Sequence, residues 1–351
     1  MKKAERSYNL DFIRIFSLFT VICVHFFLNC GYYNVLVSGG YMFIMTFLRT
    51  FFMICVPLFI TLSGYLMKDK VLSKKYYKGI VKTISIYFIT SAFCIVFKVL
   101  YQKMPMDIKG IVKSVFDYTG ASYGWYIEMY IGLFLIIPFL NLCYNGLNTQ
   151  KQKLALLATS IFVTILPPFI NVYVKILPSW WSAVYPVAYY FLGCYLKEYP
   201  LKLKKSMSLF LIFDITLLCA LASYLYSKDN VFQWASFQDH GTAGVFLNTA
   251  LVFSLLIRTK TDNLAPFFKK SLASISGLTL GAYLISYIFD SVFYPILNEK
   301  TPFEQRLYCF IPITLAVFIC SLALSYVADL IYRFGNAVFP KMEKKKEKIV
   351  K

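Results

Sequence analysis

Three ionisable residues, Asp11, Arg14 and His25, interrupt the apolar segment NLDFIRIFSLFTVICVHFF near the start of the chain. In a helix that advances about 100° and 1.5 Å per residue, Arg14 and His25 lie within about 20° of one another around the axis and about 16 Å apart along it. Asp11 lies one turn before Arg14 and faces the same way. Ionisable side chains in such a segment are costly and often functional, so this stripe is a candidate site.

The three side chains suit different chemical tasks. A buried histidine can accept a proton as a general base, or carry a transferred group as a nucleophile. Arginine presents a planar fork of N–H donors that matches phosphate oxygens. The alternative is structural: Asp11 and Arg14 pair as an anchor at the membrane surface, and His25 bonds to a neighbouring carbonyl.

The remaining sequence indicates the elements that must position these residues. Of the 351 residues, 59% are hydrophobic and 19% are aromatic, and the apolar residues recur in blocks about as long as a membrane-crossing helix. We predict an all-α integral membrane protein with about ten transmembrane helices in one bundle, over residues 1–340, and a basic cytoplasmic tail at 341–351. The predicted spans are 9–30, 41–67, 79–100, 122–142, 154–174, 182–196, 207–226, 242–257, 271–297 and 307–332.

Basic residues predict how the bundle is oriented. If the N-terminus is cytoplasmic, the cytoplasmic segments hold 26 of the 36 lysines and arginines, and the opposite segments hold eight. This asymmetry predicts a multi-pass protein of the cell membrane with cytoplasmic N- and C-termini. It also accounts for the formal net charge of +19, so we expect no nucleic-acid partner. The nine cysteines form no C-x-x-C pair and the two histidines no cluster, so we predict no metal site.

Three further charged residues fall inside predicted spans. Arg49, Glu128 and Asp290 all lie in the half of the membrane that holds His25. Because buried charges should pair, the simplest expectation is that Arg49 pairs with Glu128 or Asp290. The functional alternative is a polar chamber that binds a substrate and orients His25. The other histidine, His240, falls in a predicted outer loop, where we expect it to be solvated.

Three motifs together resemble one known family. The pattern Leu-Asp-x-x-Arg, with His25 eleven residues after the arginine, is similar to the first-helix signature of the membrane-bound acyltransferase-3 family. VPLFITLSGYLMKDK, residues 56–70, and GWYIEMYIGLFLIIPFL, residues 124–140, resemble two later motifs of that family. The ten-span layout matches as well, so the resemblance covers nearly the whole chain. LGAYLISYIF, residues 280–289, departs from it, because Ser286 stands where some members have histidine.

The resemblance implies an enzyme of the polysaccharide O-acetyltransferase type. It would transfer an acetyl (acyl) group from acetyl-CoA, its donor substrate, to a hydroxyl of a cell-surface polysaccharide or its lipid-linked precursor. Its expected partners are acetyl-CoA, a carbohydrate or glycolipid acceptor and the lipid bilayer. We expect the catalytic residues to be His25, Arg14 and Asp11. The expected donor-binding residues are Arg14, Ser63, Gly64, Lys74 and Lys75. The expected acceptor-binding residues are Arg49, Trp125, Tyr126, Glu128, Tyr283, Ser286 and Asp290.

Several of these assignments have structural alternatives. The small pair Ser63 and Gly64 also suits close helix packing, and Lys74 and Lys75 also satisfy the positive-inside rule. Aromatic residues often pack in a bundle without binding a ligand. A multi-pass transporter or flippase for a surface-glycan precursor would also have many spans and midmembrane charges, although the sequence shows no internal repeat.

Overall fold

The computed structural model describes residues 6–171, 174–234, 238–261 and 263–349, with side chains described as far as residue 337. Apart from turns, loops and two isolated β-bridges, the described part of the chain is helical. The α-helices are α1 (Tyr8–Asn29), α2 (Gly39–Phe52), α3 (Cys55–Met67), α4 (Lys74–Lys78), α5 (Val81–Leu100), α6 (Ile108–Phe116), α7 (Trp125–Asn145), α8 (Gln150–Thr164), α9 (Pro167–Ile170), α10 (Tyr185–Glu198), α11 (Lys205–Ser227), α12 (Ala243–Ile257), α13 (Pro266–Lys300) and α14 (Phe310–Ile349). Three short 3-10 helices are η1 (Tyr32–Asn34), η2 (Ser182–Val184) and η3 (Phe303–Cys309).

The prediction of an all-α multi-pass membrane protein is confirmed, but the count of ten spans is not. Among the described residues, seven helical segments are long and apolar enough to cross a membrane. They are 8–34, 39–67, 74–100, 125–145, 205–227, 266–300 and 303–337. The three other predicted spans correspond to α8, α10 and α12, which have 15, 14 and 15 residues. Helices of that length measure about 22 Å, less than the roughly 30 Å of hydrocarbon in a bilayer.

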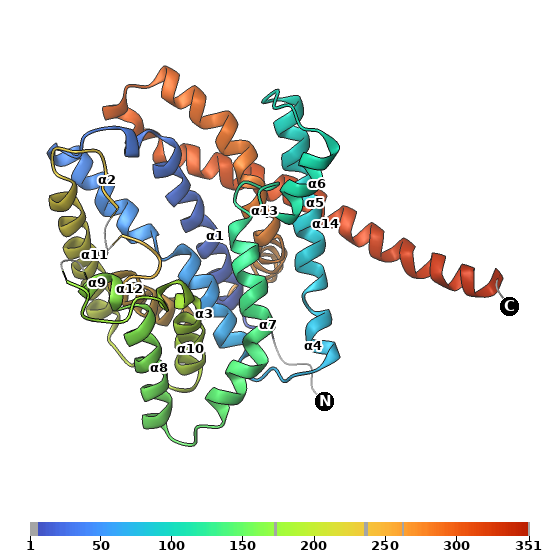
Figure 1. The fold of residues 1–351 in the computed structure, drawn as a ribbon, viewed down its shortest axis with the longest axis horizontal. Helices are drawn as coiled ribbons and strands as arrows, with labels where there is room; N and C mark the ends of the chain where they lie inside the picture. The colour runs from blue at the N-terminus through green and yellow to red at the C-terminus, as the bar shows by residue number, and fades with distance from the viewer. Residues whose placement is uncertain (1–5, 172–173, 235–237, 262, 350–351) are drawn as a thin grey trace.

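Helix α1 lies inside the bundle and packs against α2, α3, α12, α13 and α14. It runs parallel to α13: Arg14 near the start of α1 contacts Ser276, and Asn29 at the end of α1 contacts Asn298. We refer to the end of the bundle that holds Arg6, Lys68 and Lys82 as the basic end, and to the opposite end as the far end. In Figure 1, α14 leaves the helical body and ends well outside it. Residues 341–349 of the predicted tail continue this helix, and residues 350–351 lie outside the described residues.

Two prolines each free a backbone carbonyl inside the bundle. Pro57 in α3 has no N–H to donate to the Met53 carbonyl four residues earlier, and the helical segment is interrupted between α2 and α3 at residues 53–54. Pro138 in α7 similarly leaves the Phe134 carbonyl without its helical donor. The Tyr76 hydroxyl donates to that Phe134 oxygen at 2.6 Å, which holds α4 against α7.

Close packing of α3 on α10 depends on two glycines. A Cβ atom on Gly64 would meet the Tyr190 carbonyl oxygen at 2.0 Å, and one on Gly193 would meet the Thr61 carbonyl oxygen at 2.0 Å. No larger side chain fits at either position without separating the helices. This close approach accounts for Gly64 as a packing residue.

A cluster of ion pairs joins α3, α8 and α10 at the basic end. Lys68 Nζ lies 2.7 Å from one oxygen of Glu198, and Lys153 Nζ lies 2.7 Å from the other. Asp69 pairs with Lys68 at 3.0 Å and with Lys197 at 2.7 Å. Because each carboxylate contacts two ammonium groups, these residues form a network in place of isolated surface pairs.

Candidate active site

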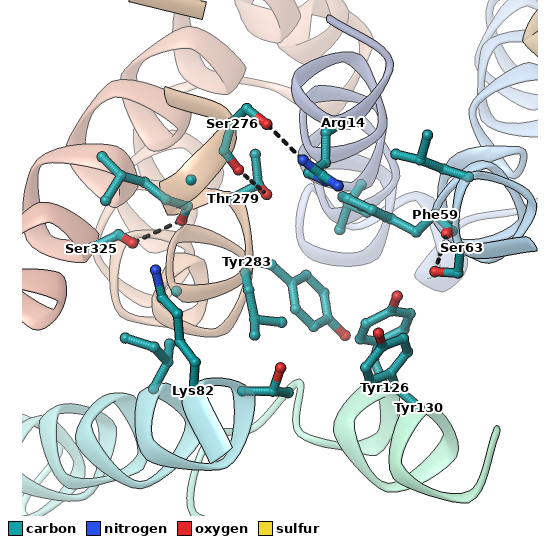
Figure 2. Close-up of a pocket in the computed structure, with 18 of the residues that line it drawn as sticks. Arg14, Phe59, Ser63, Lys82, Tyr126, Tyr130, Ser276, Thr279, Tyr283 and Ser325 are labelled. Atoms are coloured by element: carbon teal, nitrogen blue, oxygen red, sulfur yellow. Dashed lines mark hydrogen bonds between the residues drawn. The ribbon is translucent and has the colours of Figure 1, made fainter. Parts of the chain in front are cut away.

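A cavity of about 400 Å³ lies between α1, α3, α5, α7, α13 and α14. Its lining residues Gly79 and Lys82, at the basic end, are exposed, whereas Tyr126 and Tyr283 are buried in its interior. Figure 2 shows Arg14, Lys82 and the two tyrosines arranged around this space. The cavity therefore leads from a cationic opening to an aromatic end.

Arg14 forms part of the cavity wall. Its Nη1 atom donates to Ser276 Oγ at 3.0 Å and lies 3.7 Å from Asp11 Oδ1. Asp11 is held more closely by Arg6, whose Nε and Nη2 atoms donate to the two carboxylate oxygens at 2.7 and 2.9 Å. The Asp11–Arg14 contact is thus secondary to a two-pronged Arg6–Asp11 bond. Because 34% of the Arg14 side chain remains exposed, Arg14 can still receive an anionic ligand.

His25 lies in the far half of α1, 7% exposed, beside Asp290 of α13. The distance from His25 Nδ1 to Asp290 Oδ2 is 3.2 Å, within ion-pair range, although the two groups are not aligned for a hydrogen bond. The Tyr123 hydroxyl donates to the same Asp290 oxygen at 2.8 Å. The Tyr123 ring also covers the imidazole, with the two centroids 3.9 Å apart. Histidine, carboxylate and phenol therefore form one buried cluster.

A single aromatic side chain separates this cluster from the cavity. Tyr283 lines the cavity, and its ring centroid lies 6.3 Å from that of His25. The Tyr283 hydroxyl donates to the Tyr123 carbonyl at 2.7 Å, which ties the cavity wall to the residue that covers the imidazole. A ligand that enters past Arg14 therefore ends against Tyr283, one ring away from His25.

The cluster can do the chemistry that the first helix predicts. A carboxylate beside Nδ1 favours the tautomer with the proton on that nitrogen, so that Nε2 carries the lone pair. Such an imidazole can accept a proton or attack a carbonyl carbon. Arg14 and Asp11 lie eleven and fourteen residues before His25, about 16 and 21 Å along the helix, so they cannot touch the same reacting atoms. Binding of an anionic group suits Arg14 better than bond breaking does.

Only some of the residues predicted to bind the donor line the cavity. Ser63 lines the cavity, with its hydroxyl donating to the Phe59 carbonyl. Gly64 instead packs against α10, and the cavity lining does not include it. Lys74 and Lys75 are exposed on α4 and also lie outside the lining.

Three residues that sequence reasoning missed belong to the site: Lys82, Ser276 and Tyr123. Lys82 is one of the 26 basic residues that predict the orientation of the bundle, yet it also lines the cavity. Ser276 bonds to Arg14, and Tyr123 bonds to Asp290. No helical period marks Tyr123, because it precedes α7, although it lies only two residues before the tryptophan of the W-Y motif.

The predicted acceptor residues are also only partly brought together. Tyr126 and Tyr283 line the cavity and Asp290 contacts His25. Ser286 is buried, but its hydroxyl donates to the Tyr283 carbonyl within α13. Glu128 is exposed on α7 and does not face the cluster.

The predicted pairing of Arg49 with Glu128 or Asp290 is wrong. Arg49 is fully buried, and among the described residues no carboxylate lies within ion-pair distance of it. Its Nε donates to the Tyr33 hydroxyl at 2.7 Å and its Nη1 to the Gln238 carbonyl at 3.1 Å. The guanidinium also packs over the rings of Tyr33, Phe232 and Trp234. Cation–π contacts and two hydrogen bonds replace the expected ion pair.

The expectation of a solvated His240 is wrong as well. This histidine is half-buried, and its Nδ1 lies 2.9 Å from the Met53 carbonyl oxygen. Its ring is stacked against that of Trp125, with centroids 6.0 Å apart and planes within 19° of parallel. His240 therefore turns inward to the Met53 carbonyl, which Pro57 leaves without a helical donor.

A multi-pass helical bundle with a buried histidine–carboxylate pair and a cationic cavity defines a membrane protein equipped for group transfer. The chain matches the model of the acyltransferase-3 family, described as an acyltransferase domain, over residues 7–330, and it belongs to that family. The family supports acyl transfer by a membrane-embedded enzyme. Searches of curated proteins and of solved structures returned no match.

Proposed function

We propose that this protein is an integral O-acetyltransferase of the cell membrane with both termini in the cytoplasm. Acetyl-CoA is the donor, and the acceptor is a hydroxyl of a cell-surface polysaccharide or its lipid-linked precursor. The observation that carries the proposal is the buried contact of His25 with Asp290, 3.2 Å, one aromatic ring beyond a cavity that begins with Arg14 and Lys82. Family membership supports the transfer of an acyl group.

The cationic opening suits the donor. Coenzyme A carries its phosphates at one end and its thioester at the end of a long thin arm. Arg14 and Lys82 line the opening, where a bidentate guanidinium and an ammonium favour phosphate oxygens. Lys82 contacts Asp329 at 3.3 Å, and Arg333 also binds Asp329 at 2.6 Å. A donor phosphate bound by Lys82 would therefore share this lysine with the Asp329 carboxylate. The arm would extend from there toward Tyr283.

The acetyl group is transferred at His25. The acceptor hydroxyl attacks the thioester carbonyl carbon while its proton passes to His25 Nε2. The tetrahedral species collapses, the carbon–sulfur bond breaks and the CoA thiolate takes the proton from the imidazolium. Asp290 holds the imidazole and stabilises its positive charge. In a covalent variant of this route, Nε2 itself carries the acetyl group before the hydroxyl receives it.

Purified protein tests this proposal directly. Acetyl-CoA consumption should require His25, so His25→Ala should abolish it while leaving expression and membrane insertion intact. Arg14→Lys keeps the charge but loses the fork, and should raise the KM for acetyl-CoA more than it lowers kcat. Lys113→Ala, which changes an exposed lysine on α6, provides the control. Near-wild-type turnover by His25→Ala would rule out this mechanism.

A further inference from the structure

The second histidine of the chain is held in one orientation by the fold. The Met53 carbonyl has no helical donor, because Pro57 stands at the position that would supply it. His240 Nδ1 lies 2.9 Å from that oxygen and donates its proton to it, which leaves Nε2 as the acceptor nitrogen. Burial lowers the pKa of His240, so the ring is neutral at physiological pH. The fold therefore presents a fixed lone pair beside Trp125.

Arg49 anchors the segment that carries this histidine. Its Nη1 donates to the Gln238 carbonyl, two residues before His240, and its guanidinium packs on Phe232 and Trp234 of the same segment. The Tyr189 hydroxyl donates to the His240 carbonyl at 2.6 Å. Arg49, which is buried and has no carboxylate partner within the described part of the chain, thus joins α2 to the α11–α12 connection.

A chain of aromatic rings leads from this histidine to the catalytic one. His240 stacks on Trp125, whose centroid lies 6.3 Å from that of Tyr126. Tyr126 meets Tyr283 edge-on at 5.7 Å, and Tyr283 lies 6.3 Å from His25. Trp125 is 42% exposed, so part of its indole remains open to a ligand. The open indole and the fixed imidazole lie in the far half of the bundle, away from the cationic opening of the donor cavity.

We infer that Trp125 and His240 form the acceptor-binding platform and that it receives a sugar ring. This inference rests on the proposed function. The apolar C–H face of a pyranose covers the exposed indole, and one of its hydroxyls donates to His240 Nε2. Binding sites of this kind combine an aromatic surface with a few fixed polar groups. Arg49 is a positioning residue, since it acts only through Gln238 and the aromatic residues of the segment.

Sugar binding without donor tests the platform. The probe is a panel of methyl glycosides of hexoses, deoxyhexoses and N-acetylhexosamines, titrated into purified full-length protein in detergent. At least one glycoside should bind, and Trp125→Leu and His240→Phe should each weaken its binding by about tenfold or more. Trp125→Phe, which restores a flat ring, should recover most of the affinity. Trp180→Leu removes an 89% exposed tryptophan that does not contact His240, and should leave binding unchanged.

The outcomes separate this inference from the proposed function. If no glycoside binds, or if Trp125→Leu and His240→Phe bind as tightly as wild type, the platform is wrong. Equal glycoside binding by Trp125→Leu and Trp125→Phe would mean that Trp125 serves only as a membrane-surface anchor. That result would also overturn the proposed platform. Acetyl-CoA consumption that requires His25 would still support the acyltransferase in either case. Thermal unfolding identifies variants that do not fold. If His240→Phe is one of them, the comparison of Trp125→Leu with Trp125→Phe decides the inference.

Discussion

At the scale of single residues, Asp290 is the carboxylate that lies beside His25. Its carboxylate lies 3.2 Å from Nδ1 and is only 2% exposed. A buried carboxylate is tolerated where other groups bind it, and the Tyr123 hydroxyl does so at 2.8 Å. The pair therefore depends on a third residue, which positions the carboxylate as well as covering the imidazole.

Replacing Asp290 by its amide should test this role. Asp290→Asn should lower kcat/KM for acyl transfer by about 10²- to 10³-fold, within the range that general-base catalysis contributes, because a neutral amide cannot stabilise an imidazolium. Tyr123→Phe should cost less, because it leaves the charge in place. Both are measured as initial rates of CoA release, with the exposed Asp117→Asn as control. Transfer at wild-type rates by Asp290→Asn would show that the carboxylate does not assist His25.

At the scale of elements, prolines create binding points between helices. Pro57 releases the Met53 carbonyl to His240, and Pro138 releases the Phe134 carbonyl to Tyr76. A carbonyl freed inside a bundle must find another donor, since an unsatisfied polar group in hydrocarbon costs several kcal/mol. Each proline thus joins two distant segments of the chain.

A double-mutant cycle should reveal the Pro138–Tyr76 coupling. Tyr76→Phe should destabilise the protein by about 1–3 kcal/mol, because it leaves the Phe134 carbonyl unsatisfied. In a Pro138→Ala background the loss should be smaller, since the alanine N–H can bond that carbonyl. Tyr77→Phe removes a longer, exposed bond of 3.3 Å to the next carbonyl, and should have little effect. Unfolding in detergent measures all four variants, and strictly additive losses would contradict the coupling.

The ion-pair network at the basic end should make helix packing sensitive to pH. Burial raises the pKa of the Glu198 carboxyl, but hydrogen bonds from Lys153 and Lys68 outweigh burial and hold that pKa below its ordinary value. The stabilisation is therefore present above the unfolded pKa of about 4.3 and is lost as pH falls through the folded value. Glu198→Gln should lower the unfolding temperature at pH 7, and its difference from wild type should shrink below pH 4.5 or so. A difference that persists unchanged at low pH would mean that packing, and not charge, is lost.

At the scale of the whole molecule, the parallel arrangement of α1 and α13 places the donor opening and the histidine in opposite halves of the bundle. Ser276 faces Arg14 near the basic end, and Asp290 faces His25 toward the far end. With the basic end in the cytoplasm, the acetyl group would pass across the bilayer while CoA stays inside. The apolar side chains between Arg14 and His25 would limit leakage of water along this path.

Sealed vesicles of known orientation should show this sidedness. Transfer should require acetyl-CoA at the lysine-rich face and should proceed with an acceptor sugar confined to the opposite face. The reason is that 26 of the 36 basic residues lie on the predicted cytoplasmic side, and Arg14 lies near that end of α1. Product is measured as labelled acetyl on the sugar, with detergent-opened vesicles as the control. Transfer only to an acceptor on the donor's own side would contradict passage through the bilayer.

The amino-acid sequence by itself determined the helical membrane architecture and the shared face of Arg14 and His25. Both follow from local regularities, the length of apolar blocks and the 3.6-residue period, which hold wherever a helix packs. The partners of the charged residues were decided only by the tertiary structure. Arg49, Glu128 and Asp290 are expected at the same depth as His25, with Arg49 paired to one of the two carboxylates. Rotation of each helix about its own axis instead set Asp290 beside His25 and turned Arg49 toward aromatic rings.

The same holds for the loops. His240 looked like an ordinary loop histidine, because nothing in the residues around it reports where the chain returns after α11. Its position depends on a carbonyl left free by Pro57, nearly 190 residues earlier, at 2.9 Å from its ring. A local pattern describes one helix face, whereas a site in a bundle is made by several faces at once. Their relative rotation and depth are set by the packing of all the helices together.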